Sequence, residues 1–136
     1  MRRSSWSAGL LRALALVAVG SGCGGSDPVT PGGSAGFGGS CTVAVTASGM
    51  TITVCTDYNN APAAAVQQGC TSSAGSGTTT SYSAGHCTTT NLLGKCTIAS
   101  SSTVNYYYPA PGLDNAVTTS ASKTACTNSG GVWSNP

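Results

Sequence analysis

Cysteine constrains this sequence more than any other residue type. The chain has 136 residues and seven cysteines, and from Cys41 onward only 13 large aliphatic side chains are present to build a core. A core that small usually needs covalent support. Disulfides supply such support in exported proteins, whereas the cytosol keeps thiols reduced. We therefore expect a small exported domain that is stapled by disulfides.

The N-terminal segment, residues 1–22, has the order of an export signal. Arg2, Arg3 and Arg12 make its start basic, an apolar run covers residues 10–19, and small residues precede Cys23. The apolar run is too short to span a hydrocarbon core of roughly 30 Å as a helix. This order is typical of a signal peptide that is cleaved from the mature protein.

The sequence Gly20-Ser21-Gly22-Cys23 resembles the lipobox, at which bacterial lipoproteins are lipidated on cysteine and cleaved just before it. Ser21 and Gly22 fit the pattern, but Gly20 stands where the family has Leu, Val or Ile, so cleavage by an ordinary signal peptidase stays open. The resemblance implies that Cys23 carries palmitate-type acyl chains. Three chains would hold the protein in the membrane far more firmly than one.

The resemblance also implies a location in the cell envelope, facing the periplasm or the exterior. Gly24 follows Cys23 in place of the aspartate that retains lipoproteins at the inner membrane of enteric bacteria, which favours the outer membrane. Residues 23–40 are rich in Gly, Ser and Pro, a composition typical of a flexible linker with a reach of roughly 20–25 Å. We therefore expect a lipid-anchored tether over residues 23–40 and one domain over residues 41–136.

Once Cys23 is assigned to the lipid, an even set of cysteines remains in the domain: Cys41, Cys55, Cys70, Cys87, Cys96 and Cys126. An even number in an oxidising compartment implies three disulfides. The metal alternative is weak, because no C-x-x-C motif occurs and the chain has a single histidine. We expect no metal and no cofactor.

The domain contains an internal repeat. Cys41-Thr-Val begins a stretch that ends at Cys70-Thr-Ser-Ser, and Cys96-Thr-Ile begins one that ends at Cys126-Thr-Asn-Ser. Each copy has the pattern of a hairpin followed by a helix. The expected fold is a small α+β domain, with two β-hairpins forming an antiparallel sheet and two short helices, in a ββα-ββα pseudo-repeat. The helices should begin after Asn60, with Pro62 in the first turn, and near Asp114.

The register of the first hairpin limits how the cysteines pair. A loop over residues 46–49 places Cys41 opposite Val54, which puts Cys41 and Cys55 on opposite faces of the hairpin. These two cysteines should therefore not pair with each other. Repeat symmetry predicts the pairs Cys41–Cys70 and Cys96–Cys126, with Cys55–Cys87 left over, although six cysteines allow 15 pairings in principle.

The C-terminal segment Cys126-Thr-Asn-Ser-Gly-Gly-Val-Trp-Ser resembles the C-T-x-x-G-G-x-W ending of small cysteine-rich lipoproteins of myxobacteria and their relatives. The segment Cys55-Thr-Asp-Tyr is similar to the same group. The resemblance implies the location and the disulfide framework, and it implies no activity.

The charged and catalytic residues exclude several classes of function. After Cys23 the chain has two lysines and no arginine, too few cations to neutralise the phosphates of a nucleic acid. A Ser-His-Asp triad would need His86 beside Asp57 or Asp114, and no G-x-S-x-G motif surrounds any serine. The S-x-x-K motif Ser120–Lys123 lacks its K-T-G partner. We expect a protein that is not an enzyme; a hydrolase would require His86 within hydrogen-bond reach of an aspartate.

The candidate binding residues are aromatic: Tyr106, Tyr107, Tyr108 and Trp133. On a strand, Tyr106 and Tyr108 share one face and Tyr107 points to the other. One interpretation places one face beneath a helix and leaves Tyr107 on the surface. The other makes Tyr107 and Trp133 a platform for a cell-wall or surface glycan or an envelope protein. We expect a non-catalytic envelope lipoprotein, with such a binding module as the alternative.

Overall fold

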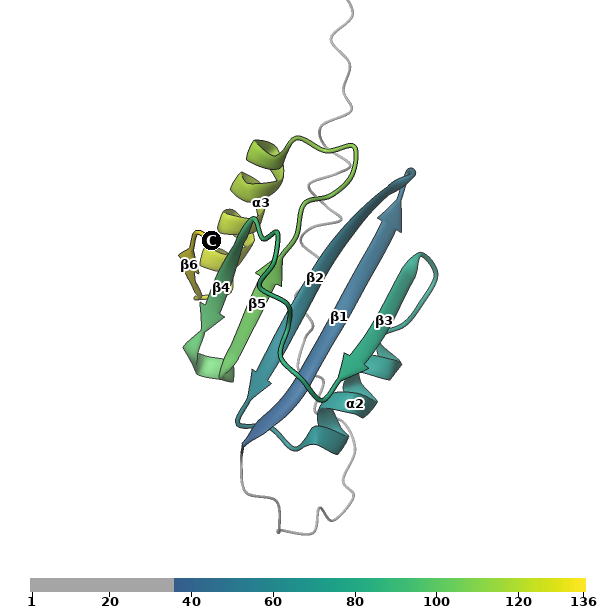
Figure 1. Cartoon of the computed structure of the whole chain (residues 1–136), viewed down its shortest axis with the longest axis vertical. Helices are drawn as coiled ribbons and strands as arrows, with labels where there is room; N and C mark the ends of the chain where they lie inside the picture. Colours follow the sequence, from purple (N-terminus) through teal and green to yellow (C-terminus); the bar gives the residue numbers. More distant parts are fainter. Residues whose placement is uncertain (1–35) are drawn as a thin grey trace, which may run out of the picture. The chain divides into compact units, whose positions relative to one another are not determined.

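The structure is a computed structural model, and it describes residues 36–136. The expected signal peptide, the expected lipidation site Cys23 and most of the expected tether lie outside the described residues. The elements are β1 (Phe37–Ala47), β2 (Met50–Asn59), α2 (Ala63–Ser72), β3 (Thr78–Ser83), β4 (Gly94–Ile98), the 3-10 helix η2 (Ala99–Ser101), β5 (Thr103–Tyr107), α3 (Asn115–Asn128) and β6 (Val132–Ser134). The strands form one sheet in the order β3-β1-β2-β5-β4-β6, and all neighbours are antiparallel (Figure 1).

The fold is a small α+β domain with three disulfides, as expected, but each repeat has one more strand than predicted. The chain order is ββαβ twice rather than ββα twice. The missed strands are β3 and β6, each at one edge of the sheet. Sequence patterns did not predict them because β3 consists of threonine and serine apart from Tyr82 and so lacks the alternation of apolar and polar residues, and β6 has only three residues.

The two repeats are arranged symmetrically in the sheet. Cys41 of β1 pairs with Thr56 of β2 and with Tyr82 of β3, and Cys96 of β4 pairs with Asn105 of β5 and with Trp133 of β6. Thr56 and Asn105 face each other where the two repeats meet, and the Thr56 hydroxyl donates to Asn105 Oδ1 at 2.8 Å. An approximate two-fold axis therefore passes between these two residues.

Both helices lie on one face of the sheet, behind it in Figure 1. The helix α2 packs on β1 and β3, and α3 packs on β4 and β6. Their N-caps are Pro62 and Asp114, and Asp114 Oδ1 accepts a hydrogen bond from the Ala116 N–H at 2.7 Å. The predicted starts of both helices are confirmed.

The disulfides join Cys41 to Cys70, Cys55 to Cys87 and Cys96 to Cys126. These are the three pairs that repeat symmetry predicts. The first and the last of them attach α2 to β1 and α3 to β4. Six of the nine buried apolar residues of the domain are these cysteines. The disulfides are therefore a large part of the core as well as its staples.

The predicted register of the first hairpin was wrong by two residues. The loop consists of Ser48 and Gly49 alone, with φ values of 53° and 78°, and Cys41 lies opposite Thr56 instead of Val54. Two residues with positive φ make the tight turn that suits the twist of a hairpin. Because side chains alternate with a period of two, a shift of two residues keeps each of them on its face. Cys41 and Cys55 are therefore still on opposite faces.

The domain begins earlier than expected, because residues 37–40, assigned to the tether, are the first residues of β1. Their glycines serve close packing rather than flexibility. A Cβ on Gly38 would lie 2.6 Å from the carbonyl oxygen of Ala61, and a Cβ on Gly39 would lie 2.7 Å from the ring of Tyr82. Composition alone does not distinguish such a glycine from one in a linker.

Each repeat places an aromatic ring of its edge strand over a glycine that stands two residues before the first cysteine. Tyr82 lies against Gly39, and Trp133 lies against Gly94 so closely that a Cβ there would overlap the indole ring. We predict that Gly94→Ala destabilises the domain by about 1–3 kcal/mol, because the methyl group has no room. Denaturant unfolding under non-reducing conditions measures this change.

Gly69→Ala is the matched control. Gly69 lies within α2, and nothing stands within 4 Å of a Cβ built on it. Alanine should stabilise the helix there by about 0.5–1 kcal/mol. If the two substitutions change the free energy of unfolding in the same direction, the packing of Trp133 on Gly94 is not what the structure indicates.

Candidate functional site

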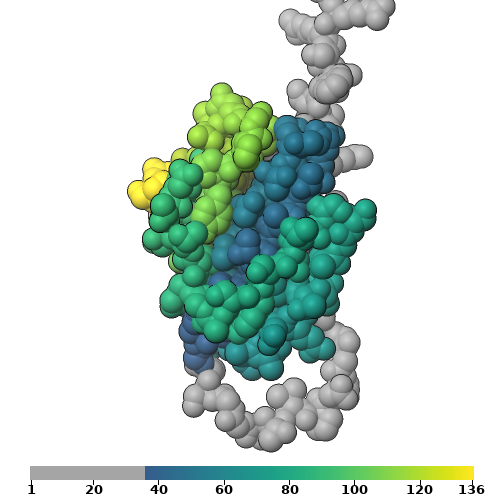
Figure 2. All heavy atoms as spheres, turned by 45° about the vertical axis from the view of Figure 1, so that its right-hand side comes forward, coloured from purple at the N-terminus to yellow at the C-terminus, as the bar shows by residue number. Residues whose placement is uncertain are grey.

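The connection from β3 to β4, residues 84–93, crosses the face of the sheet that carries no helix; we call it the strap. Figure 1 shows it passing in front of β1 and β2, and in the space-filling view the upper part of the β1–β2 hairpin stays uncovered (Figure 2). The disulfide Cys55–Cys87 fixes the strap to β2. The repeat does not generate the strap, because the strap joins the two repeats.

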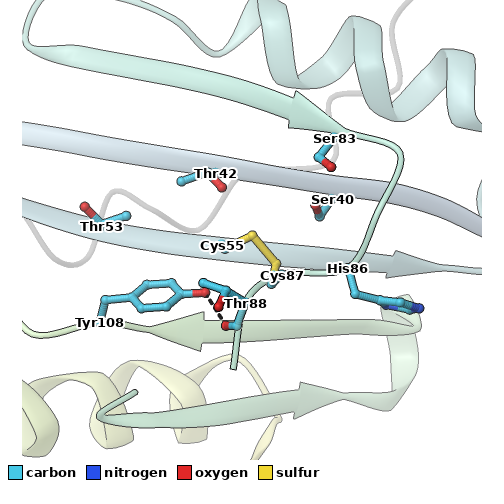
Figure 3. Close-up of a pocket in the computed structure, with 9 residues that line it drawn as sticks. All are labelled: Ser40, Thr42, Thr53, Cys55, Ser83, His86, Cys87, Thr88 and Tyr108. Carbon is cyan, nitrogen blue, oxygen red and sulfur yellow. Dashed lines mark hydrogen bonds between the residues drawn. A yellow bond between two sulfur atoms is a disulfide. The ribbon is translucent and has the colours of Figure 1, made fainter. Parts of the chain in front are cut away.

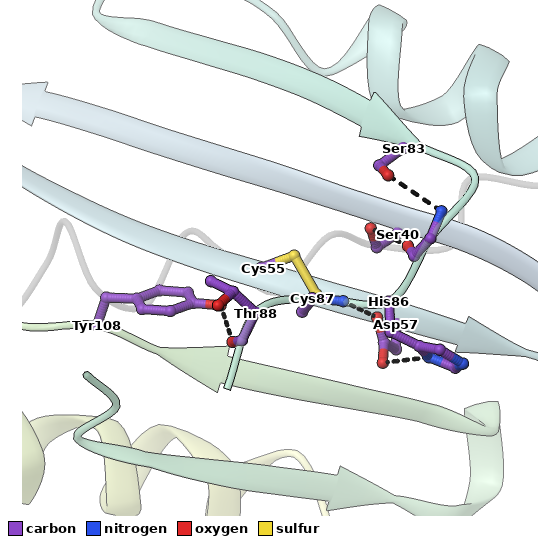
Figure 4. Close-up of polar contacts among 9 residues, drawn as sticks. Ser40, Cys55, Asp57, Ser83, His86, Cys87, Thr88 and Tyr108 are labelled. Carbon is purple, nitrogen blue, oxygen red and sulfur yellow. Dashed lines mark hydrogen bonds and ion pairs between the residues drawn. A yellow bond between two sulfur atoms is a disulfide. The ribbon is translucent and has the colours of Figure 1, made fainter. Parts of the chain in front are cut away.

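Polar contacts fix the strap next to this disulfide. Asp57 is only 2% exposed, and its two carboxylate oxygens accept hydrogen bonds from the Cys87 N–H at 2.8 Å and from His86 Nδ1 at 2.9 Å (Figure 4). The Ser40 hydroxyl donates to the carbonyl of Gly85 at 2.7 Å. Three consecutive strap residues are thus bound to the sheet.

His86 is within hydrogen-bond reach of Asp57, which is the condition given above for a hydrolase. The other parts of a triad do not assemble around it. Its ring stacks on Phe37 with 3.8 Å between centroids and points away from Ser40 and Ser83 (Figure 4). In residues 36–136, no serine hydroxyl hydrogen-bonds to Nε2 of His86, so a nucleophile–base pair is missing there. The observed action of the His86–Asp57 pair is to hold the strap.

The four aromatic candidates divide between the two faces of the sheet. Tyr107 and Trp133 lie on the helix face, where their ring centroids are 5.4 Å apart. Tyr106 lies on the open face, in register with Cys55. Tyr108 follows β5, and its hydroxyl donates to the Thr88 carbonyl of the strap at 2.7 Å.

The interpretation that placed Tyr106 and Tyr108 beneath a helix and Tyr107 opposite them was therefore wrong. The helix α3 is bound to Cys96, whose neighbour Asn105 shares its face with Tyr107. Alternation along β5 then puts Tyr106 on the other face. All four aromatic side chains are half-buried. Tyr107 and Trp133 do form one surface, as a platform would require.

Burial is the main cause of the pKa shifts in the domain. It raises the pKa of Tyr58 and Tyr107, and it raises the pKa of Tyr106 and Tyr108 together with a smaller contribution from the negative charge of Asp57. The phenols near Asp57 therefore stay neutral and keep their donor hydrogen, which suits them to hydrogen bonding rather than to acid–base chemistry at neutral pH.

Sequence reasoning missed Asp57, Ser40 and Phe37 as partners of the strap. A signal for Asp57 was present, because it stands two residues after Cys55 on one strand and therefore shares its face. His86 stands directly before the partner of that cysteine. Ser40 and Phe37 gave no such signal, because both stood in the segment assigned to the tether.

Comparisons of the chain with models of protein families, with curated proteins and with solved structures each give no match. Over the described residues, no helix is both long and apolar enough to cross a membrane. The same part of the chain contains no group of three or more side chains able to hold a metal ion.

We predict that Asp57→Ala frees the strap while the sheet stays folded. The substitution removes the partner of the His86 ring and leaves the buried Cys87 N–H without an acceptor, which costs about 1–3 kcal/mol. Amide hydrogen exchange should become faster in residues 84–93 and stay slow in α2 and β1. Asp114→Ala, which removes an exposed helix cap, should leave exchange in the strap unchanged; equal protection of the strap in both variants would contradict this role of Asp57.

A second prediction follows from the tyrosine pKa values. Because burial raises the pKa of Tyr58 above 10.0, the folded protein holds this phenol proton more tightly than the unfolded chain. The stability that neutral Tyr58 contributes is complete below about pH 10 and is lost as the pH rises through the folded-state pKa. The hydroxyl has no hydrogen-bond partner among the described residues, so Tyr58→Phe should flatten this alkaline loss at little cost near neutral pH. Denaturant unfolding at several pH values measures it, and an unchanged slope in the variant would refute it.

Proposed function

We propose that this chain is a non-catalytic lipoprotein of the cell envelope, anchored through an acylated Cys23 and carrying its disulfide-stapled domain on a short tether. The observation that supports the proposal most is the use of cysteine. The sequence has seven cysteines, and the six in the domain form three disulfides with one another. An intrachain bridge to Cys23 would require one of these to open. Acylation gives the seventh cysteine a role that needs no partner thiol.

The disulfides also support an oxidising compartment, because the cytosol does not maintain bonds of this kind. Three of the fixed residues of the C-T-x-x-G-G-x-W ending have a place in the framework. Cys126 closes a disulfide, a Cβ on Gly131 would lie 2.9 Å from its sulfur, and Trp133 covers Gly94. The similarity to small lipoproteins of myxobacteria therefore rests on residues that build the domain, which supports a shared framework and, with it, a shared location in the cell envelope.

The absence of catalysis is part of this proposal. Its support is that the strongest candidate for acid–base chemistry, the His86–Asp57 pair, fastens the strap to the sheet. A binding role is the second candidate function. The observation that favours it is that aromatic side chains lie half-buried on both faces, with Tyr107 against Trp133 on one and Tyr108 beside the strap on the other.

The anchor is tested by expressing the full chain and its Cys23→Ser variant in a bacterium and separating membrane from soluble fractions. We expect the unaltered chain in the membrane fraction, with an N-terminal peptide that begins at a triacylated Cys23. The Cys23→Ser variant should lose that mass and leave the detergent phase on partitioning, and Ser26→Ala should behave like the unaltered chain. A soluble protein with an unmodified Cys23 thiol would overturn the anchor and favour cleavage by an ordinary signal peptidase.

A further inference from the structure

A hollow of about 300 Å³ lies on the open face, between the strap and the β1–β2 hairpin (Figure 3). That volume is at the lower end of the range for small-ligand pockets. Its lining consists mainly of hydroxyl-bearing side chains and one disulfide: Ser40, Thr42, Thr53, Cys55, Ser83, His86, Cys87, Thr88 and Tyr108.

Two hydroxyls of the lining are free to bind a ligand. Thr42 pairs with Cys55 and Thr53 pairs with Ala44, so the two threonines lie diagonally across adjacent strands on the open face. Neither hydroxyl makes a hydrogen bond within the part of the chain that the structure describes. A hydroxyl group donates one hydrogen bond and accepts two. The hydroxyls of Thr42 and Thr53 therefore offer a ligand both hydrogen-bond donors and hydrogen-bond acceptors.

The rest of the wall is rigid and partly apolar. The disulfide Cys55–Cys87 borders the hollow, and the ring of Tyr108 is held in place because its hydroxyl donates to the Thr88 carbonyl at 2.7 Å. Figure 3 shows the ring and the disulfide on the same side of Thr42 and Thr53 as the strap. An apolar wall next to free hydroxyls matches a sugar ring, which has C–H faces and a rim of hydroxyls.

The charges around the hollow disfavour an ionic ligand. Among the described residues, no lysine, arginine or exposed carboxylate lines it, and the ring of His86, which does, is paired with the buried Asp57 beneath the strap. An anion or a cation would leave water without a partner of opposite charge. An extended peptide is disfavoured as well, because β1 and β2 are paired on both sides and offer no free backbone edge there.

We propose that this hollow is a binding site for a neutral saccharide, recognised by the hydroxyls of Thr42 and Thr53 and by the ring of Tyr108. The residues named for the site all belong to the described domain, and none of them is the proposed lipidation site. Saccharide binding and lipid anchoring can therefore succeed or fail separately. The site also differs from the Tyr107–Trp133 surface, which lies on the opposite face of the sheet.

The test is an NMR titration of the purified full chain with three disaccharides at millimolar concentrations: N,N′-diacetylchitobiose, cellobiose and lactose. We expect saturable shifts of the amides of Thr42, Thr53 and Thr88 with at least one sugar. Thr53→Val exchanges the hydroxyl for a methyl group of the same shape and should weaken binding about three- to tenfold. Thr53→Ser, which retains a hydroxyl, should keep most of the affinity. Affinity retained in this variant would show that the loss in Thr53→Val comes from the missing hydroxyl.

Thr97→Val is the matched control, because Thr97 is an exposed threonine of β4 on the same face and lies outside the hollow. It should leave the affinity unchanged. The proposal is overturned if none of the three sugars gives saturable shifts, or if Thr97→Val weakens binding as much as Thr53→Val does. Shifts that map to Tyr107 and Trp133 would place saccharide binding on the helix face and would equally overturn this assignment.

Discussion

The covalent bonds between helices and sheet are the interaction on which this domain depends. The helix α3 buries Thr118 and Ser122 beside Cys126, and it buries no large aliphatic side chain. Such a face removes little apolar surface from water, so packing alone would hold the helix weakly. The Cys96–Cys126 disulfide supplies both the attachment and the most deeply buried atoms, since Cys96 is 0% and Cys126 is 1% exposed. The same holds for α2, where Cys41–Cys70 is joined only by Val66.

The symmetry of the two repeats explains where the functional candidates arise. The pairing of Thr56 with Asn105 makes Val104 the counterpart of Cys55, and Tyr106 the counterpart of Asp57. The third disulfide and the buried carboxylate therefore occur in one repeat only, and both hold the strap. On the face of the sheet that carries the helices the two repeats are similar, and on the open face they differ. The hollow proposed as a binding site lies on this altered face.

The parts of the fold that the sequence predicted depend on patterns of period two or on fixed spacings. The three disulfides were predicted from the even number of cysteines, the repeat and the alternation along the first hairpin, even though the predicted register of that hairpin was wrong by two residues. The caps at Pro62 and Asp114 placed both helices. The features that the sequence did not predict have no local signal. The segment β3 is a strand because it pairs with the edge of β1. Gly39 belongs to the sheet because the ring of Tyr82 needs the space that a side chain would fill. The hollow was missed because it exists only once the strap lies across the hairpin.

The burial of Asp57 gives the strap a single position. After Cys23 the chain has three aspartates, and burying one of them would be costly unless its oxygens were hydrogen-bonded. The strap meets that requirement by bringing the Cys87 N–H and the His86 ring to this carboxylate. Another path would break both of these hydrogen bonds, next to the Cys55–Cys87 disulfide that already fixes the strap to β2. The walls of the hollow are thereby fixed before a ligand arrives, and a preformed site loses less conformational entropy on binding than a mobile one. In a domain with so few charges, one carboxylate thus determines the shape of the face opposite the helices.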